Sequence, residues 1–266
     1  MIMNEQVIIK NHLVSYFKSE NAGQKCLLFL HGWRSQKEVW ETVIKRFKDL
    51  KIERLDAYAI DLPGFGVSSA PAEAWSVGDY AEVVRDFIEK MELKNIIIIG
   101  HSFGGRVGIK LAAGHPELVN KLVLVDSAGF IDKSSKNKIL AWTSALVRPF
   151  FRPKFMQGMR RKIYQSIGAS DYLDSPGLQR TFVNVVKEDL SEDMKGIKIP
   201  TLIITGENDK DTPIAFGEKM QELIPNSKFQ ILKNAGHYSF LDQREEFVKI
   251  VEKFINTDIT DWTRIY

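Results

Sequence analysis

Cysteine is almost missing from the sequence: Cys26 is the only one among 266 residues, so no disulfide can form within the chain. This excludes the small secreted domains that depend on a disulfide framework, and it favours a reducing compartment. The formal net charge of +3 is too small to suggest a nucleic-acid partner. No apolar run approaches the roughly 18 residues of a membrane-spanning helix, and no signal segment opens the sequence. We therefore expect a cytoplasmic protein without a membrane span.

Motifs for bound metals and phosphates are missing as well. The sequence has no His-Glu-x-x-His and no cysteine pair that would suggest a metal site. The glycine-rich stretch 100–105 lacks both the Gly-Lys-Ser/Thr of a phosphate-binding loop and the spacing of a dinucleotide fingerprint. We expect neither a metal nor a cofactor.

Hydrophobic residues make up 44% of the chain and charged residues 27%, which is typical of a globular protein and argues against disorder.

Apolar runs with the pattern of buried strands alternate with amphipathic runs with the pattern of helices. The strands are predicted at 26–30, 56–60, 96–99, 121–126, 199–205 and 228–232. The helices are predicted near 38–50, 76–91, 106–113, 213–223 and 242–255. Residues 6–18 alternate around Asn11-His12 and predict an antiparallel hairpin at one edge. Strands that alternate with helices form a mostly parallel sheet covered on both faces, so the fold class is α/β.

The alternation stops between residues 131 and 196. This stretch has helix-like segments interrupted by proline, without a run typical of a buried strand. We predict a core domain of residues 1–130 and 197–266, and an inserted helical cap of residues 131–196.

The most informative stretch is 96–105, with the sequence IIIIGHSFGG. Four β-branched residues predict a strand buried on both faces, and Gly100 and Gly104 permit a turn so tight that the next helix folds back on the strand. Ser102 lies at the tip of this turn, where its hydroxyl is accessible and the helix N-terminus faces an incoming oxygen. This arrangement is typical of a nucleophile elbow.

A serine hydroxyl needs a neighbouring base to remove its proton, and the base needs a carboxylate to fix its tautomer. Of the five histidines, only His237 lies on a late loop after a strand, where Gly236 gives the backbone freedom to project the ring. Two carboxylates end predicted strands, Asp209 and Asp126. The residues alone leave both open as the acid.

Together these motifs resemble the α/β-hydrolase fold superfamily, and in particular serine hydrolases of the carboxylesterase type with a helical cap. The resemblance implies a catalytic triad of Ser102, Asp209 and His237 in the chain order of this fold. It favours Asp209 because most members carry the acid in Gly-x-x-Asp with a proline four residues later. Some members carry it after the earlier strand, which keeps Asp126 as the alternative.

The resemblance also implies an oxyanion hole, formed by two backbone N–H groups that stabilise the negative charge on the attacked carbonyl oxygen. One N–H comes from Phe103, after the nucleophile, and the other from Trp33 in the family's His-Gly-x motif. His31 in that motif is expected to form structural hydrogen bonds. The stretch 61–68, which matches a further family loop, is expected to be architectural and to pack beside the site.

The expected reaction is hydrolysis of a small-molecule substrate, a small to medium acyl or aromatic ester, through an acyl-enzyme. We expect the protein to be a monomer or a homodimer. One alternative is cofactor-free hydrolysis of a carbon–carbon bond in a ring-cleavage diketo acid. Such relatives usually place a small polar residue before the serine and a tryptophan after the histidine, where this chain has His101 and Tyr238. Another alternative is a non-enzymatic receptor that uses the pocket for binding. Candidate substrate contacts are His31, Phe130, Trp142, Phe151, Met156 and Tyr238.

Overall fold

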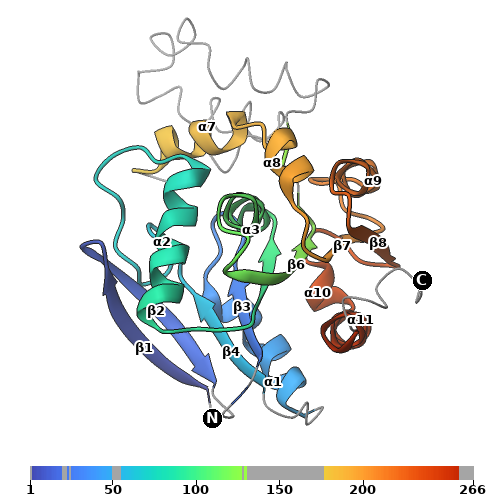
Figure 1. Ribbon diagram of the computed structural model, residues 1–266, viewed down its shortest axis with the longest axis horizontal. Helices are drawn as coiled ribbons and strands as arrows, with labels where there is room; N and C mark the ends of the chain where they lie inside the picture. The colour runs from blue at the N-terminus through green and yellow to red at the C-terminus, as the bar shows by residue number, and fades with distance from the viewer. Residues whose placement is uncertain are drawn as a thin grey trace, which may run out of the picture.

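The computed structural model describes residues 2–19, 23, 25–49, 55–127, 129–130 and 177–257. Its centre is an eight-stranded sheet with the strand order β1-β2-β4-β3-β5-β6-β7-β8 (Figure 1). The strands are β1 (Met3–Ile9), β2 (His12–Ser19), β3 (Lys25–Leu30), β4 (Leu55–Ile60), β5 (Ile96–His101), β6 (Val119–Val125), β7 (Thr201–Gly206) and β8 (Ser227–Leu232). β2 is antiparallel to β1 and to β4, and the other neighbours are parallel. The predicted α/β fold with a mostly parallel sheet is confirmed.

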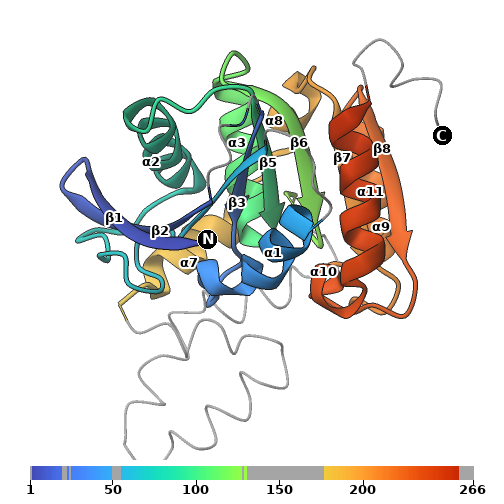
Figure 2. The ribbon, with the colours of Figure 1, turned by 90° about the horizontal axis from the view of Figure 1, so that it is seen from below.

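Helices cover both faces of the sheet (Figure 2). They are η1 (Lys37–Trp40, a 3₁₀ helix), α1 (Glu41–Asp49), α2 (Val77–Lys90), α3 (Phe103–Gly114), α7 (Gln179–Lys187), α8 (Ser191–Gly196), α9 (Ile214–Leu223), α10 (Ser239–Asp242) and α11 (Arg244–Asn256). α1 and α11 pack on one face, and α2, α3 and α9 pack on the other. Successive strand residues point to opposite faces. Leu27 and Phe29 of β3 therefore belong to the core under α1 and α11, and Leu28 and Leu30 belong to the core under α2, α3 and α9.

Two predicted element boundaries were wrong by a few residues. The helix expected near 38–50 begins as the 3₁₀ turn η1, and the α-helix starts only at Glu41. The turn of the N-terminal hairpin lies at Lys10 and Asn11, both with positive φ, and His12 already belongs to β2. The helix predicted near 76–91 is present as α2 and begins with a capping box, in which Ser76 and Asp79 bond each other's backbone N–H groups.

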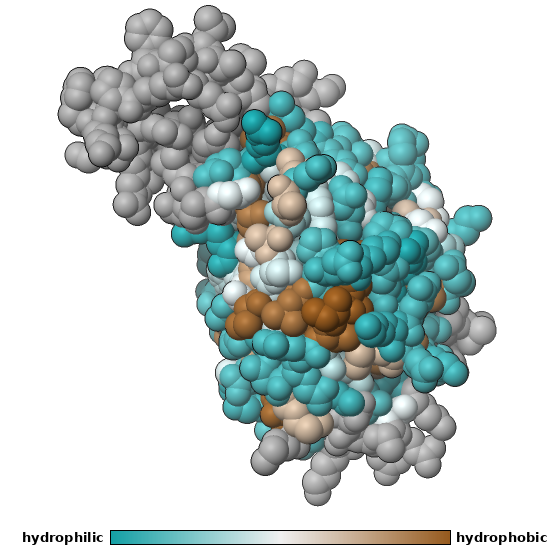
Figure 3. Space-filling view, turned by 90° about the vertical axis from the view of Figure 1, so that its left-hand side faces the viewer, coloured by the Kyte–Doolittle hydropathy of each residue, from teal (hydrophilic) through white to brown (hydrophobic). Residues whose placement is uncertain are grey.

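The hairpin forms one edge of the sheet, with β1 as its last strand. Met3 and Ile8 of β1 are 41% and 52% exposed, although both are large hydrophobic residues. A hydrophobic band crosses the otherwise mostly hydrophilic side of the molecule on which β1 and α2 lie (Figure 3).

Of the predicted cap, the structure describes residues 177–196, which contain α7 and α8. These two helices pack against the core. Phe182 of α7 packs on Trp33 with ring centroids 5.2 Å apart, and α8 packs on α3. The buried guanidinium of Arg106 in α3 donates to the carbonyl oxygens of Val185 and Glu188 at the end of α7. The other predicted cap positions lie outside the described residues, so the division into core and cap stays a prediction.

Candidate active site

Ser102 lies on a sharp turn between β5 and α3. Its backbone has φ 50° and ψ −110°, a conformation that residues with a Cβ rarely adopt. A Cβ on Gly100 would lie 2.5 Å from the Gly104 carbonyl oxygen, and one on Gly104 would collide with the backbone of Leu30, so the turn requires both glycines. The Ser102 N–H donates to the Val125 carbonyl oxygen at 2.9 Å and ties the turn to β6. The serine is thus presented, half-buried, at the N-terminus of α3.

Asp209 and His237 are hydrogen-bonded to each other, with 2.9 Å between Asp209 Oδ2 and His237 Nδ1. Because a carboxylate only accepts, Nδ1 carries the proton and Nε2 is the free base. Asp209 Oδ1 accepts the N–H groups of Asp211 and Thr212, at 2.8 and 3.0 Å, and Oδ2 accepts the Thr212 hydroxyl at 2.6 Å in addition to the His237 N–H. These bonds hold the acid in one orientation.

The same contacts shift both pKa values. Burial disfavours the charged form of Asp209, but hydrogen bonds from His237 and Thr212 outweigh it and hold the pKa of Asp209 below its ordinary value. Burial also disfavours the imidazolium, but the bond to Asp209 outweighs it and raises the pKa of His237 above its ordinary value. A raised pKa makes His237 a stronger base towards a hydroxyl proton.

Asp126, the alternative acid, is directed to a different set of partners. Its side chain is fully buried, and its two oxygens accept the N–H groups of Gly206 at 2.8 Å and Ser239 at 2.9 Å. Burial raises the pKa of Asp126 to about 7, against the effect of these two bonds. The structure therefore pairs His237 with Asp209, and Asp126 joins the loops that follow β6, β7 and β8.

His237 reaches the elbow on the loop of residues 233–238, between β8 and α10, which we call the base loop. The ring of His101, the residue directly before Ser102, lies 4.9 Å from the ring of His237 between centroids. His101 Nε2 also lies 2.7 Å from the main-chain oxygen of His237. The base loop therefore packs against the turn that carries the serine, although the two are separated by two strands of the sheet.

The predicted oxyanion loop also lies against the elbow. A Cβ on Gly32 would lie 2.7 Å from His101 Nδ1 and 3.4 Å from Ser102 Cβ, so the chain passes close to the serine just before Trp33. His31 is fully buried; its Nδ1 contacts the Gly32 carbonyl oxygen at 2.7 Å, and its Nε2 accepts the Leu62 N–H at 3.0 Å. Both ring nitrogens are used, so His31 fits the structural role and not that of a substrate contact.

The remaining substrate-contact candidates fall into three situations. Phe130 is buried against Phe216 of α9, with ring centroids 5.0 Å apart, and Lys219 lies over its ring, so its side chain is part of the core. Tyr238 is 40% exposed and lies next to the base, which leaves it accessible to a ligand. The other three lie outside the described residues: Trp142, Phe151 and Met156.

Lys37 is a residue of this region that the sequence does not reveal. Its side chain is buried, and Nζ lies 2.8 Å from Asp61 Oδ2, while its own N–H donates to Asp61 Oδ1 at 2.7 Å. Asp61 also accepts the N–H of Val67 at 3.1 Å. The pair joins η1 to the loop 61–68, which agrees with an architectural role for that loop. No pattern in the sequence distinguishes Lys37 from the exposed lysines, because its burial is a tertiary effect.

The described residues contain one group with the composition of a metal site, Asp209, Asp211 and His237, whose ligand atoms lie within 4.8 Å of one another. Asp209 Oδ2 and His237 Nδ1 already bond each other in the acid–base pair. A metal ion bound through these two atoms would have to break that bond. The donor set therefore fits acid–base chemistry better than metal binding.

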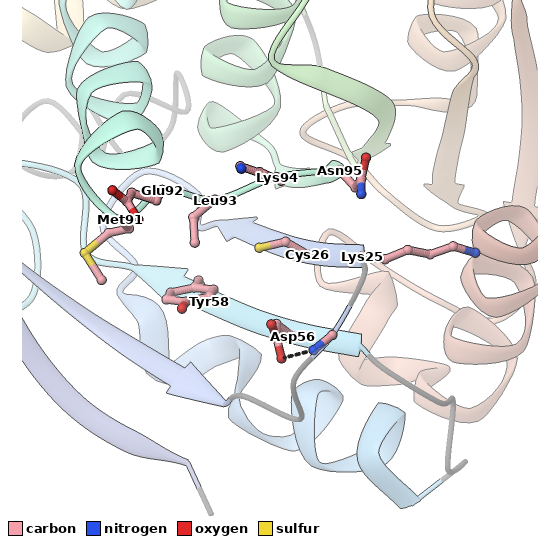
Figure 4. Close-up of a pocket in the computed structure, with 10 residues that line it drawn as sticks. Lys25, Cys26, Asp56, Tyr58, Met91, Glu92, Leu93, Lys94 and Asn95 are labelled. Carbon is pink, nitrogen blue, oxygen red and sulfur yellow. Dashed lines mark hydrogen bonds between the residues drawn. The ribbon is translucent and has the colours of Figure 1, made fainter.

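A separate hollow of about 500 Å³ opens at the opposite end of the sheet, at the amino ends of β3 and β4 (Figure 4). Lys25 and Cys26 of β3, Asp56 of β4 and the residues 91–95 after α2 line it. None of Ser102, Asp209 and His237 is among its lining residues, so it is distinct from the candidate site.

Among the described helices, none is both long and apolar enough to cross a membrane.

The elbow on a parallel sheet with helices on both faces, and a late histidine paired with an acid after β7, define an α/β hydrolase. The model of the Alpha/beta hydrolase family matches residues 27–250, and the chain belongs to that family.

Known relatives agree with this class. The chain is 26% identical to the AB hydrolase superfamily protein YisY of Bacillus subtilis, over 96% of this chain and all of that protein. It is also 26% identical to a 2-hydroxymuconate semialdehyde hydrolase of Pseudomonas putida, over 86% of each chain. Among solved structures, an esterase from Exiguobacterium antarcticum has the same fold, with a TM-score of 0.75 at 23% identity over 96% of this chain and 100% of that one. The protein is therefore a hydrolase of this fold.

Proposed function

We propose that the protein is a serine hydrolase that cleaves carboxylic esters through an acyl-enzyme, with Ser102, Asp209 and His237 as the triad. The observation that carries the proposal is the hydrogen-bonded Asp209–His237 pair, held by the base loop against the turn that presents Ser102. This arrangement has the three roles that acyl transfer requires: a nucleophile, a base and a group that orients the base.

In the proposed reaction, Ser102 Oγ attacks the ester carbonyl carbon while His237 Nε2 takes the hydroxyl proton. Asp209 stabilises the imidazolium that forms. The N–H groups of Trp33 and Phe103 would stabilise the charge on the carbonyl oxygen. The imidazolium then gives its proton to the leaving alcohol, which leaves the acyl group on Ser102. Water, deprotonated by His237, then attacks this acyl-enzyme. The acyl–oxygen bond breaks, the acid leaves, and the imidazolium returns the proton to Ser102 Oγ, which restores the serine hydroxyl.

Aromatic side chains beside the site favour an acyl or aromatic group of small to medium size. The ring of Trp33 packs edge-on against Phe65 and Phe103, with centroids 4.9 and 5.2 Å away, and against Phe182 of α7 at 5.2 Å. Trp33 is only partly buried, so part of this apolar cluster is accessible next to the serine.

The test is turnover of p-nitrophenyl esters of graded acyl length by the parent and by Ser102→Ala. We expect the parent to hydrolyse at least the short esters and the variant to lose that activity by several orders of magnitude. A Ser102→Ala variant as fast as the parent with p-nitrophenyl acetate and butyrate would refute the proposal. A parent that reacts with a fluorophosphonate probe but turns over no ester would instead favour the receptor alternative.

A second candidate is carbon–carbon bond hydrolysis of a ring-cleavage diketo acid, which is favoured by the similarity to the 2-hydroxymuconate semialdehyde hydrolase. His101 and Tyr238 flank the serine and the histidine where such relatives usually have a small polar residue and a tryptophan, which favours the ester. Cap cations at 148, 152, 160 and 161, outside the described residues, are the candidates to bind a substrate carboxylate. Turnover of a coloured dienoate in place of esters would support this candidate.

A further inference from the structure

We propose that His101 is a positioning residue for the candidate base: its ring donates a hydrogen bond to the main-chain oxygen of His237 and fixes the base loop against the nucleophile elbow. The inference rests on the proposed function for its kinetic consequence but not for its geometry. It gives a role to a side chain whose neighbour in the sequence is the nucleophile itself.

The hydrogen bond determines the tautomer of His101. A carbonyl oxygen only accepts, so the Nε2 that lies 2.7 Å from the His237 oxygen carries the proton, and Nδ1 carries none. Nδ1 is buried and has no hydrogen-bond partner among the described residues. Burial, and to a smaller extent the neighbouring His237, lowers the pKa of His101 to about 3. The ring is therefore neutral at any pH near neutrality, and within the described part of the chain its one hydrogen bond is the one that holds the base loop.

Packing also restrains the His101 ring. The residue is 1% exposed, and its ring lies 4.9 Å from Tyr238 and 5.0 Å from Phe240 between centroids. On its other side, the Nδ1 edge faces Gly32 so closely that a Cβ there would lie 2.7 Å away. One buried side chain thus contacts the base loop and the predicted oxyanion loop at once.

A second anchor lies just after the base loop, at Ser239, the first residue of α10. Asp126 Oδ2 accepts the Ser239 N–H at 2.9 Å, and its other oxygen accepts the Gly206 N–H. His101 therefore holds the base loop at His237 itself, and Asp126 holds the start of α10 two residues later. Because His237 Nδ1 must meet an Asp209 carboxylate that is fixed by its own bonds, small displacements of the loop would lengthen the 2.9 Å contact.

Two substitutions at this position separate the hydrogen bond from packing. His101→Gln places an amide N–H near the position of Nε2, whereas His101→Leu keeps similar bulk without any donor. We expect His101→Leu to lower kcat for a p-nitrophenyl ester by about 10- to 100-fold with little change in KM, because misplacement by about 1 Å costs on the order of 10²-fold. We expect His101→Gln to recover most of the loss.

The decisive readout needs no substrate. NMR titration of the His237 ring in the folded protein should show its pKa falling in His101→Leu towards the ordinary value of about 6.5, and returning towards the parent value in His101→Gln. His237 is faced by Asp209, Asp211 and Asp126, which both variants retain, and neutral His101 changes no charge. General loss of stability would lower the unfolding temperature but would leave the pKa of His237 in the folded state unchanged.

A folded His101→Leu with the parent kcat and the parent pKa of His237 would overturn the proposal. A lower kcat with an unchanged pKa would overturn it too, because the loss would then lie in the oxyanion loop. If the parent has no Ser102-dependent turnover, the proposed function fails while the titration still decides the role of His101. If His101→Leu does not fold, His101→Asn replaces it, since its amide is too short to reach the His237 oxygen and should give the same fall in pKa.

Discussion

Replacement of Asp209 by asparagine tests the acid of the proposed triad. The hydrogen bonds of Asp209 show why the variant should lose activity. The Asp209 oxygen that accepts the backbone N–H groups of Asp211 and Thr212 can be replaced by the amide oxygen without loss. The amide nitrogen then occupies the place of Oδ2, opposite His237 Nδ1. Since that nitrogen only donates, Nδ1 must become the acceptor and the proton moves to Nε2. The base then points a proton at Ser102 and cannot accept one.

We expect Asp209→Asn to lower kcat for a p-nitrophenyl ester by about 10⁴-fold, as loss of the correct tautomer does in a serine triad. This corresponds to about 5 kcal/mol of transition-state stabilisation. KM should change little, because the fold of the loop is retained. The pKa of His237 should fall, since its main raising contact is lost. Stopped-flow release of p-nitrophenol and NMR titration of the ring measure the two effects.

Asp126→Asn is the matched control, because it changes the alternative acid by the same substitution. If Asp209→Asn keeps a tenth or more of the parent kcat while Asp126→Asn abolishes turnover, the assignment of the acid is refuted. The opposite order, with the larger loss at Asp209, is the predicted result.

Three further results follow from the buried and titrating groups. Lys37→Met should lower the free energy of unfolding, measured by urea titration, by about 3 kcal/mol or more, because it leaves Asp61 buried without its cation. The control Lys45→Met breaks an exposed ion pair and should cost under about 1 kcal/mol, so equal losses in the two variants would contradict this prediction. Activity should fall on acidification as His237 protonates, with the midpoint of kcat/KM above 6.5 because its folded-state pKa is raised; a midpoint below 6.5 would be inconsistent with the Asp209 contact. Arg106→Met should leave the carbonyl groups of Val185 in α7 and of Glu188 just after it without their donor, and should lower stability by about 1–3 kcal/mol. Thermal unfolding measures this loss, and an unchanged midpoint would refute the anchoring of α7.

The sheet and its order of elements were predictable because their signals are local. The run IIIIGHSFGG gives a buried strand, two obligatory glycines and a serine within ten residues, and β5, the turn and α3 follow it closely. The capping box of α2 is equally local. The start of α1 was wrong because the pattern of apolar residues does not separate a 3₁₀ turn from an α-helix that continues it.

The details of the site depend on contacts between distant segments, and the sequence contains no direct signal for them. Asp126 and Asp209 both follow strands, and only the path of the base loop decides which of them meets His237. The contact of His101 with the oxygen of His237 joins positions 136 residues apart. The burial of Lys37 depends on Asp61 in another loop. Such pairings follow from the assembled sheet and not from any one stretch.

The most direct test of the proposed mechanism is the identity of the nucleophile. The protein is treated with a fluorophosphonate probe, and the adduct is located by peptide mass spectrometry. We predict one adduct, on the peptide that contains Ser102, absent in Ser102→Ala and formed more slowly in His237→Ala. An adduct on another residue, or no adduct in a folded protein that still hydrolyses esters, would contradict the proposed mechanism.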